Sequence, residues 1–123
     1  MALKYLDFDC SVEPDGSACF DALAAVAPAH LASLHAEVAE VLCWADHHFA
    51  DQRGAIDDGG EWDFDLASHQ EWTADDGLDF DLASKSFRRT PGAAGSVRHV
   101  LSLSITGRAA FAEAFRAAFV VDD

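Results

Sequence analysis

A strict alternation of apolar residues with aspartate constrains this chain more than any other feature of its sequence. A heptad spans Trp62–Ser68 (WDFDLAS) and recurs at Leu78–Ser84 (LDFDLAS), and its core also occurs at Leu6–Asp9 (LDFD). Alternation with a period of two residues is typical of a β-strand, whose side chains point to opposite faces in turn. We therefore expect three strands, each with apolar side chains on one face and carboxylates on the other.

The carboxylates of these strands should lie together on one exposed face of a sheet. Such a face attracts a basic surface on another protein, and we expect it to be a binding site. Glu71 joins it because the expected pairing sets it opposite Asp81, and Trp44 joins it as a large anchor beside acidic residues. The predicted partner-binding residues are Asp7, Asp9, Asp63, Asp65, Asp79, Asp81, Glu71 and Trp44.

A turn sequence near the start of the chain predicts a hairpin and its register. Segment 13–16 has proline second and glycine fourth, which favours a type I turn followed by a left-handed glycine. That turn would set Val12 opposite Ala18 and Cys10 opposite Phe20. The apolar faces of the two strands then coincide.

A second turn is predicted at segment 74–77, which ends in aspartate and glycine. It would pair Trp72 with Phe80 and set Glu71 opposite Asp81. Two like charges directly across a strand pair are unfavourable unless a cation or a basic group lies between them. The predicted acid face therefore requires a positive partner.

Helical spacing of apolar residues predicts one helix from Pro28 to about Phe49 and another after Thr106, with an alternating strand at 97–105. The expected order is ββαβββα. Tight hairpins require antiparallel neighbours, so we predict an α+β fold with a five-stranded antiparallel sheet and two helices on one face. Residues 1–123 would form a single domain, with a mobile acidic loop at 51–61.

The charge of the chain is large and unevenly distributed. The net charge is −14; residues 1–84 hold nineteen acids and two bases, a net of −17, and residues 85–123 hold three acids and six bases, a net of +3. This balance disfavours contact with nucleic acid and anionic membranes and attracts basic proteins. Solubility or adaptation to a salt-rich cytoplasm is the alternative explanation of the acidity.

The sequence predicts a cytoplasmic location. No apolar run approaches the roughly 18 residues of a membrane span, and the first residues lack the form of a signal peptide. Three cysteines without metal-like spacing suit a reducing compartment better than a disulfide framework.

Catalytic and metal-binding motifs with a strong spacing signature are missing from the sequence, so we expect no cofactor and favour a protein that is not an enzyme. The alternative is a divalent metal near the end of the first helix. Histidines in a last helical turn also interact favourably with the helix dipole without any metal. The candidate ligands are His47, His48, Cys43 and His69.

The leading hypothesis is a small acidic intracellular binding module that engages a basic protein. One alternative is an inhibitor that mimics nucleic acid, with aspartates in place of phosphates, and another is a metal-dependent enzyme that uses the His/Asp cluster. A homo-oligomer is a further option, in which Arg88, Arg89 and Arg98 of one copy meet the acid face of another.

Overall fold

The structure is a computed structural model that describes residues 3–93 and 95–119. Within these residues the chain forms six strands, two α-helices and two short 3-10 helices. Their bounds are β1 Asp9–Val12, β2 Ala18–Val26, η1 Pro28–His30, α1 Leu31–His48, η2 Ile56–Asp58, β3 Trp62–Trp72, β4 Asp76–Asp81, β5 Ser86–Pro91, β6 Val97–Gly107 and α2 Ala109–Phe119. The order matches the prediction except for one additional strand.

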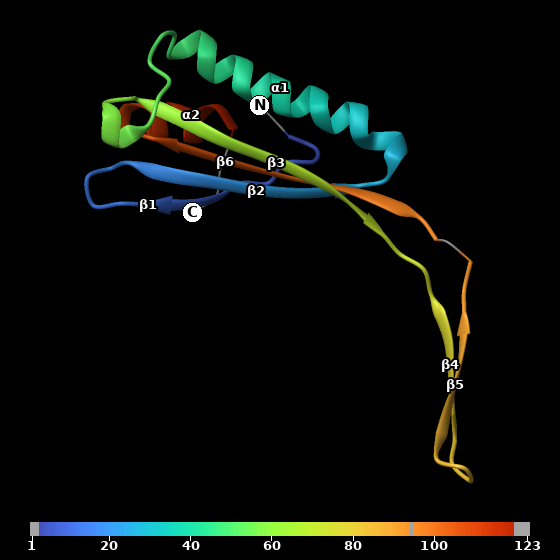
Figure 1. Cartoon of the computed structure of the whole chain (residues 1–123). Coiled ribbons are helices and arrows are strands. Elements are labelled where there is room, and N and C mark those ends of the chain that lie inside the picture. Colours follow the sequence, from blue (N-terminus) through green and yellow to red (C-terminus); the bar gives the residue numbers. More distant parts are fainter. Residues whose placement is uncertain (1–2, 94, 120–123) are drawn as a thin grey trace.

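The strands form two antiparallel sheets rather than one. β1, β2, β6 and β3 lie in that order in a four-stranded sheet, and β4 pairs with β5 in a second sheet. Both helices share a hydrophobic core with one face of the four-stranded sheet (Figure 1). The α+β class with two helices on one face is confirmed, whereas the prediction of a single five-stranded sheet is wrong. We call the opposite face of the four-stranded sheet the outer face.

The first hairpin has the predicted turn and register. Gly16 adopts a φ of 90°, the left-handed conformation that the turn requires. Cys10 lies opposite Phe20 and Val12 lies opposite Ala18, as expected. The turn chemistry alone was enough to fix this pair of strands.

An aromatic cluster joins the helices to the sheet. The Trp62 ring stacks on that of Phe111, with centroids 5.5 Å apart and planes 4° apart, and Phe20 contacts Phe115 at 4.4 Å. Gly107 lies opposite Trp62, and a Cβ at this glycine would come 2.2 Å from the Phe111 ring. The missing side chain therefore allows Phe111 to reach Trp62.

A buried carboxylate ties the N-terminal segment to α1. The Glu37 side chain accepts hydrogen bonds from the backbone N–H groups of Lys4, Tyr5 and Leu6 at 3.0, 2.9 and 2.7 Å. Hydrogen bonds to an ionised acceptor are stronger than those between neutral groups. Glu37 therefore satisfies three donors of a segment that precedes the first strand.

Segment 51–61, expected to be a mobile acidic loop, contains η2 and contacts Arg108. The Arg108 guanidinium donates to the carbonyl oxygens of Ile56 and Gly60 at 2.8 and 2.9 Å. Its mobility stays a prediction.

The second predicted hairpin is wrong. Trp72 pairs with Val97 instead of Phe80, and Phe80 pairs with Phe87. β3 and β6 pair along their whole length, from the buried aromatic cluster outward, so segment 74–77 lies within a longer hairpin. The turn of that hairpin is at residues 82–85, where Lys85 has a φ of 56°.

The long hairpin bends where β3 gives way to β4. Residues 73–75 separate β3 from β4, whereas the longer segment 92–96 separates β5 from β6. The two connections across the bend therefore differ in length. At this place the hairpin turns away from the sheet and helices (Figure 1). We call residues 76–91 the arm, and every one of them is exposed.

The first repeated heptad lies within β3, whereas the second lies in β4 only up to Asp81 and ends in the turn, and the two lie in different surroundings. Asp63 and Asp65 of the first heptad project away from the core, as the alternation predicts, and Trp62 is 1% exposed. Leu78, the corresponding residue of the second heptad, is 63% exposed, because the arm lies beyond the helices. The apolar face of the second heptad is therefore not buried.

We predict that Glu37→Ala lowers the free energy of unfolding by about 2–4 kcal/mol, because backbone donors lose a charged acceptor. Urea denaturation followed by circular dichroism measures this change. Glu40→Ala removes an exposed carboxylate from the same helix and should change stability by less than about 0.5 kcal/mol. Equal losses in the two variants would contradict the anchoring role of Glu37.

Candidate functional site

A row of carboxylates crosses the outer face of the four-stranded sheet. The register places Asp9 opposite Asp21, Asp21 opposite Ser104, and Ser104 opposite Asp65. The three aspartates are exposed and lie on the face that the helices leave uncovered. We call Asp9, Asp21 and Asp65 the acid row. Neighbouring strands are about 4.8 Å apart, so Asp9 and Asp21 lie close enough to repel each other, whereas Asp65 lies two strands from Asp21.

Hydrogen bonds position the centre of the acid row. The Ser104 hydroxyl donates to Oδ1 of Asp21 at 2.5 Å, and the Cys19 thiol lies 3.5 Å from both Asp21 Oδ2 and the Ser104 hydroxyl. Burial raises the pKa of the Cys19 thiol, and the adjacent Asp21 carboxylate also raises it. Cys19 therefore remains a neutral thiol that can donate to Asp21.

Asp63, which lies two residues from Asp65 on the same face of β3, is already paired with a base. Arg53 Nε donates to Asp63 Oδ1 at 3.1 Å, and the guanidinium of Arg53 lies 4.5 Å from the centre of the Phe64 ring. Asp63, Asp65 and Ser104 border a small hollow of about 110 Å³ on the outer face. Asp63 is therefore a neighbour of the acid row whose charge Arg53 already balances.

The other predicted carboxylates do not all join this row. Asp7 is exposed and precedes β1, whereas Asp79 and Asp81 lie in the arm, beyond the bend. Glu71 lies near the outer end of β3, where it pairs with Arg98 instead of Asp81. The structure therefore divides the predicted acid face between the outer face of the sheet and the arm.

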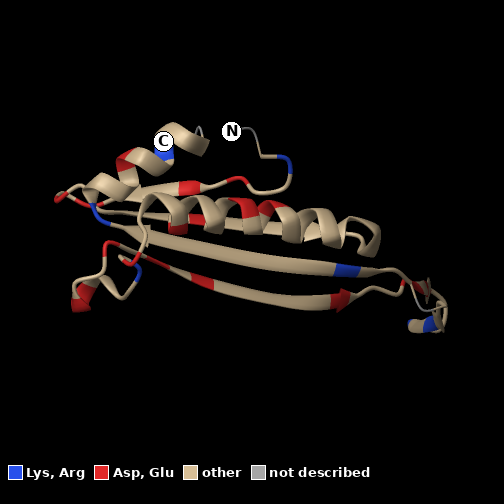
Figure 2. Ribbon diagram, turned by 90° about the horizontal axis from the view of Figure 1, so that it is seen from above, with Lys and Arg blue, Asp and Glu red and all other residues tan. Residues whose placement is uncertain are grey.

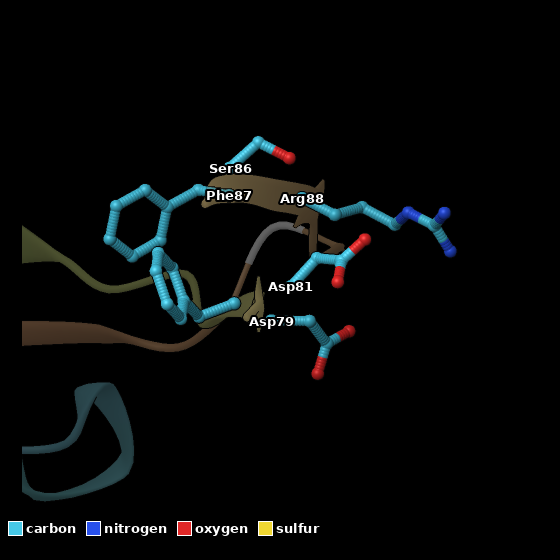
Figure 3. A pocket seen from close by; sticks show the side chains of 6 residues that line it. Asp79, Asp81, Ser86, Phe87 and Arg88 are labelled. Atoms are coloured by element: carbon cyan, nitrogen blue, oxygen red, sulfur yellow. The ribbon is translucent and has the colours of Figure 1, made fainter. Parts of the chain in front are cut away.

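In the arm, acidic side chains are matched by basic ones. Arg89 donates to Asp76 at 2.7 Å, and Asp79 lies directly across from Arg88. Asp79, Asp81 and Arg88 lie on one side of the arm, around a shallow hollow of about 430 Å³, and Phe87 points to the other side (Figure 3). On the four-stranded sheet and helices, by contrast, Lys and Arg are sparse (Figure 2).

Asp81 serves the turn of the arm. Its carboxylate accepts from the backbone N–H of Ala83 at 3.0 Å. Hydrogen bonding with Ser84 and then with Ala83 lowers the pKa of Asp81. This carboxylate is thus occupied in closing the turn that follows β4.

Trp44 is half-buried and packs on the aromatic core. Its ring meets those of Phe111, Phe115 and Phe119 edge-on at 6.1, 5.9 and 5.2 Å. It also stacks on His48 at 4.7 Å. Its packing accounts for its position in the fold, and its role as a contact residue stays a prediction.

The candidate metal ligands lie on two different elements. Cys43, His47 and His48 belong to α1, and the Nδ1 atom of His48 lies 2.9 Å from the carbonyl oxygen of Trp44. His69 lies on β3, 3.2 Å from Glu71. Within residues 3–93 and 95–119, no three His, Cys, Asp or Glu side chains are grouped so as to hold a metal ion.

Sequence reasoning missed two parts of the surface. Asp21 and Ser104 complete the acid row, and the predicted first-hairpin register already implied that Asp21 faces Asp9. An apolar groove between α1 and β3, of about 470 Å³, was not anticipated. No local pattern announces it, because its two walls come from distant parts of the chain.

Comparison with family models, with curated proteins and with solved structures finds no match to this chain. In the part of the chain that the structure describes, no helix combines the length and apolar character needed to cross a membrane. The function must therefore be argued from the surfaces themselves.

We predict that Asp9→Asn stabilises the fold by roughly 0.3 kcal/mol at low ionic strength, because it removes repulsion with Asp21. The gain should disappear in 1 M salt, where the screening length is about 3 Å. Thermal unfolding at low and at high salt tests this. Glu40→Gln removes the same charge from α1, and an equal gain there would show that net charge alone is responsible.

Proposed function

We propose that this protein is a binding module whose outer sheet face engages a basic surface of another protein. The observation that carries the proposal is the acid row, which is exposed on a sheet face that neither helix covers. A row of aspartates that faces only water weakens the fold, because its members repel one another. Lysine or arginine side chains of a partner would relieve that repulsion.

An exposed leucine beside the acid row favours a protein as the partner. The next row of the outer face consists of Leu23, Ser102 and Ala67, and Leu23 is 70% exposed. Protein interfaces combine apolar contacts with a charged or polar surround, whereas solubility requires no exposed leucine. The carboxylates would speed encounter and set orientation, and Leu23 would add buried apolar area.

Two other hypotheses from the sequence have less support. Mimicry of nucleic acid requires carboxylates spread over a longer path, and two of the three acids of the arm are paired with or lie opposite bases. A metal-dependent enzyme requires ligands that converge on one point, and the candidate ligands lie on α1 and β3. Both stay predictions.

A charge-matched pair of variants tests the proposed function. The triple variant Asp9→Asn, Asp21→Asn and Asp65→Asn removes the acid row, and asparagine at position 21 can still accept from Ser104. The control Asp46→Asn, Asp57→Asn and Asp58→Asn removes the same charge from exposed residues of α1 and η2.

Each protein is immobilised and exposed to extract of the native cell at low salt, and retained proteins are quantified. We expect the unmodified protein and the control to retain the same basic protein and to release it as salt rises. The acid-row variant should retain roughly tenfold less, which corresponds to about 1.4 kcal/mol. Equal losses in both variants would contradict the proposal, because net charge would then explain the binding.

A further inference from the structure

The arm is a two-stranded hairpin whose large apolar side chains are exposed to water. Phe80 and Phe87 contact each other at 4.9 Å, and yet they are 48% and 70% exposed. Leu78 and Leu82 are 63% and 81% exposed. Two-stranded hairpins without a packed face are marginally stable, so an arm whose residues are all exposed would gain stability from a partner surface.

Three of the four large apolar side chains of the arm lie on one face, and Leu82 lies in the turn. Phe80 and Leu78 of β4 lie opposite Phe87 and Arg89 of β5, and the side chains of Asp79 and Arg88 occupy the other face (Figure 3). From these exposures, the four large apolar residues of the arm present on the order of 500 Å² to solvent. Contiguous patches of this size usually mark an interaction site.

An apolar groove that fits this face lies on the same protein. Its walls are α1 and the middle of β3, and its volume is about 470 Å³. Its apolar lining consists of Val38, Ala39, Leu42, Leu66, Ala67 and Leu101. β3 is an edge strand of the four-stranded sheet, so the groove opens beside backbone groups that no neighbouring strand covers. Leu66, on the edge strand itself, is 47% exposed.

We propose that the arm of one protomer binds in the α1–β3 groove of a second copy, and that the second copy returns the contact. β3, which forms one wall of the groove, and the arm belong to the same bent hairpin, on either side of the bend (Figure 1). A two-fold axis between the copies makes the contact reciprocal, so the arm of each copy lies along β3 of the other. One symmetry operation therefore places both arms in both grooves.

Charge and area favour a second copy as the occupant. The arm holds three acids (Asp76, Asp79 and Asp81) and three bases (Lys85, Arg88 and Arg89), a net of zero, so the rest of the chain carries the whole net charge of −14. The neutral arm therefore adds no repulsion of its own where it contacts an acidic copy. Two arms and two grooves together would bury more than about 1,200 Å², the lower limit for a specific protein interface.

Sedimentation velocity of the whole chain over a range of concentrations tests the proposal. We expect a species of twice the 13.2 kDa chain mass. The double variant Phe80→Ser and Phe87→Ser should weaken dimerisation roughly 30-fold or more, and Leu66→Glu should do the same from the groove side. The matched control Leu23→Ser changes an equally exposed apolar residue on the outer face and should leave the dimer intact.

A mixing experiment distinguishes exchange from packing of arm against arm. The arm variant and the Leu66→Glu variant together retain one intact arm and one intact groove, so we expect native mass spectrometry to detect a heterodimer of the two. A Leu66→Glu protein that remains fully dimeric would overturn the proposal in favour of arm–arm packing.

Two further outcomes would overturn it. A protein that is monomeric at about 200 µM, roughly 200-fold above a dissociation constant of about 1 µM, does not form the dimer. A monomer that sediments with lipid vesicles, but no longer does so after the Phe80/Phe87 change, would assign the arm to membranes. Circular dichroism of the arm variant checks that the body stays folded. The proposal does not depend on the acid row, so dimerisation should be unchanged in the Asp9/Asp21/Asp65 variant.

Discussion

The pairing of β3 with β6 is the constraint on which the rest of the structure depends. It is fixed at its inner end, where Trp62 lies opposite Gly107 and stacks on Phe111. A slip of one residue would turn Trp62 toward water and move a side chain into the space that the Phe111 ring occupies. Since the register is fixed there, it also determines where the hairpin leaves the body and where the arm begins.

The helices are shorter than the hairpin that they cover, and this difference produces the exposed surfaces. The buried residues of α1 end at Ala45, and those of α2 pack over the inner ends of the strands. Phe64 is partly buried, but its counterpart Phe80 is half exposed, although both occupy the same place in the repeated heptad. The repeat therefore encodes two similar strands, and the reach of the helices decides which of them has a core.

This difference explains how far the sequence could predict the fold. The register of the first hairpin followed from a local turn with a left-handed glycine, and the α+β class followed from the periodicity of each segment. The second hairpin was wrong because the signal at 74–77 competed with a long-range pairing that no local pattern reveals. The buried Glu37 escaped notice for the same reason, since its partners are 31–33 residues away. Of the acid row, Asp9 and Asp65 were predicted and Asp21 was not, and the division of the predicted aspartates between sheet and arm was not foreseen.

The two exposed surfaces use their charges in opposite ways. In the arm, Asp76 is paired with Arg89, and Asp79 faces Arg88, so these charges stabilise the hairpin itself and leave its apolar face as the unsatisfied part. On the outer face, Asp9 and Asp21 lie directly opposite each other, and the hydroxyl of Ser104 is a neutral donor that cannot cancel their charge. The apolar face of the arm, whose neighbouring charges balance one another, suits a contact with an identical chain. Identical copies repel each other wherever their charges are unbalanced. An unbalanced acidic surface suits a different protein of opposite charge, so the two faces can act at the same time.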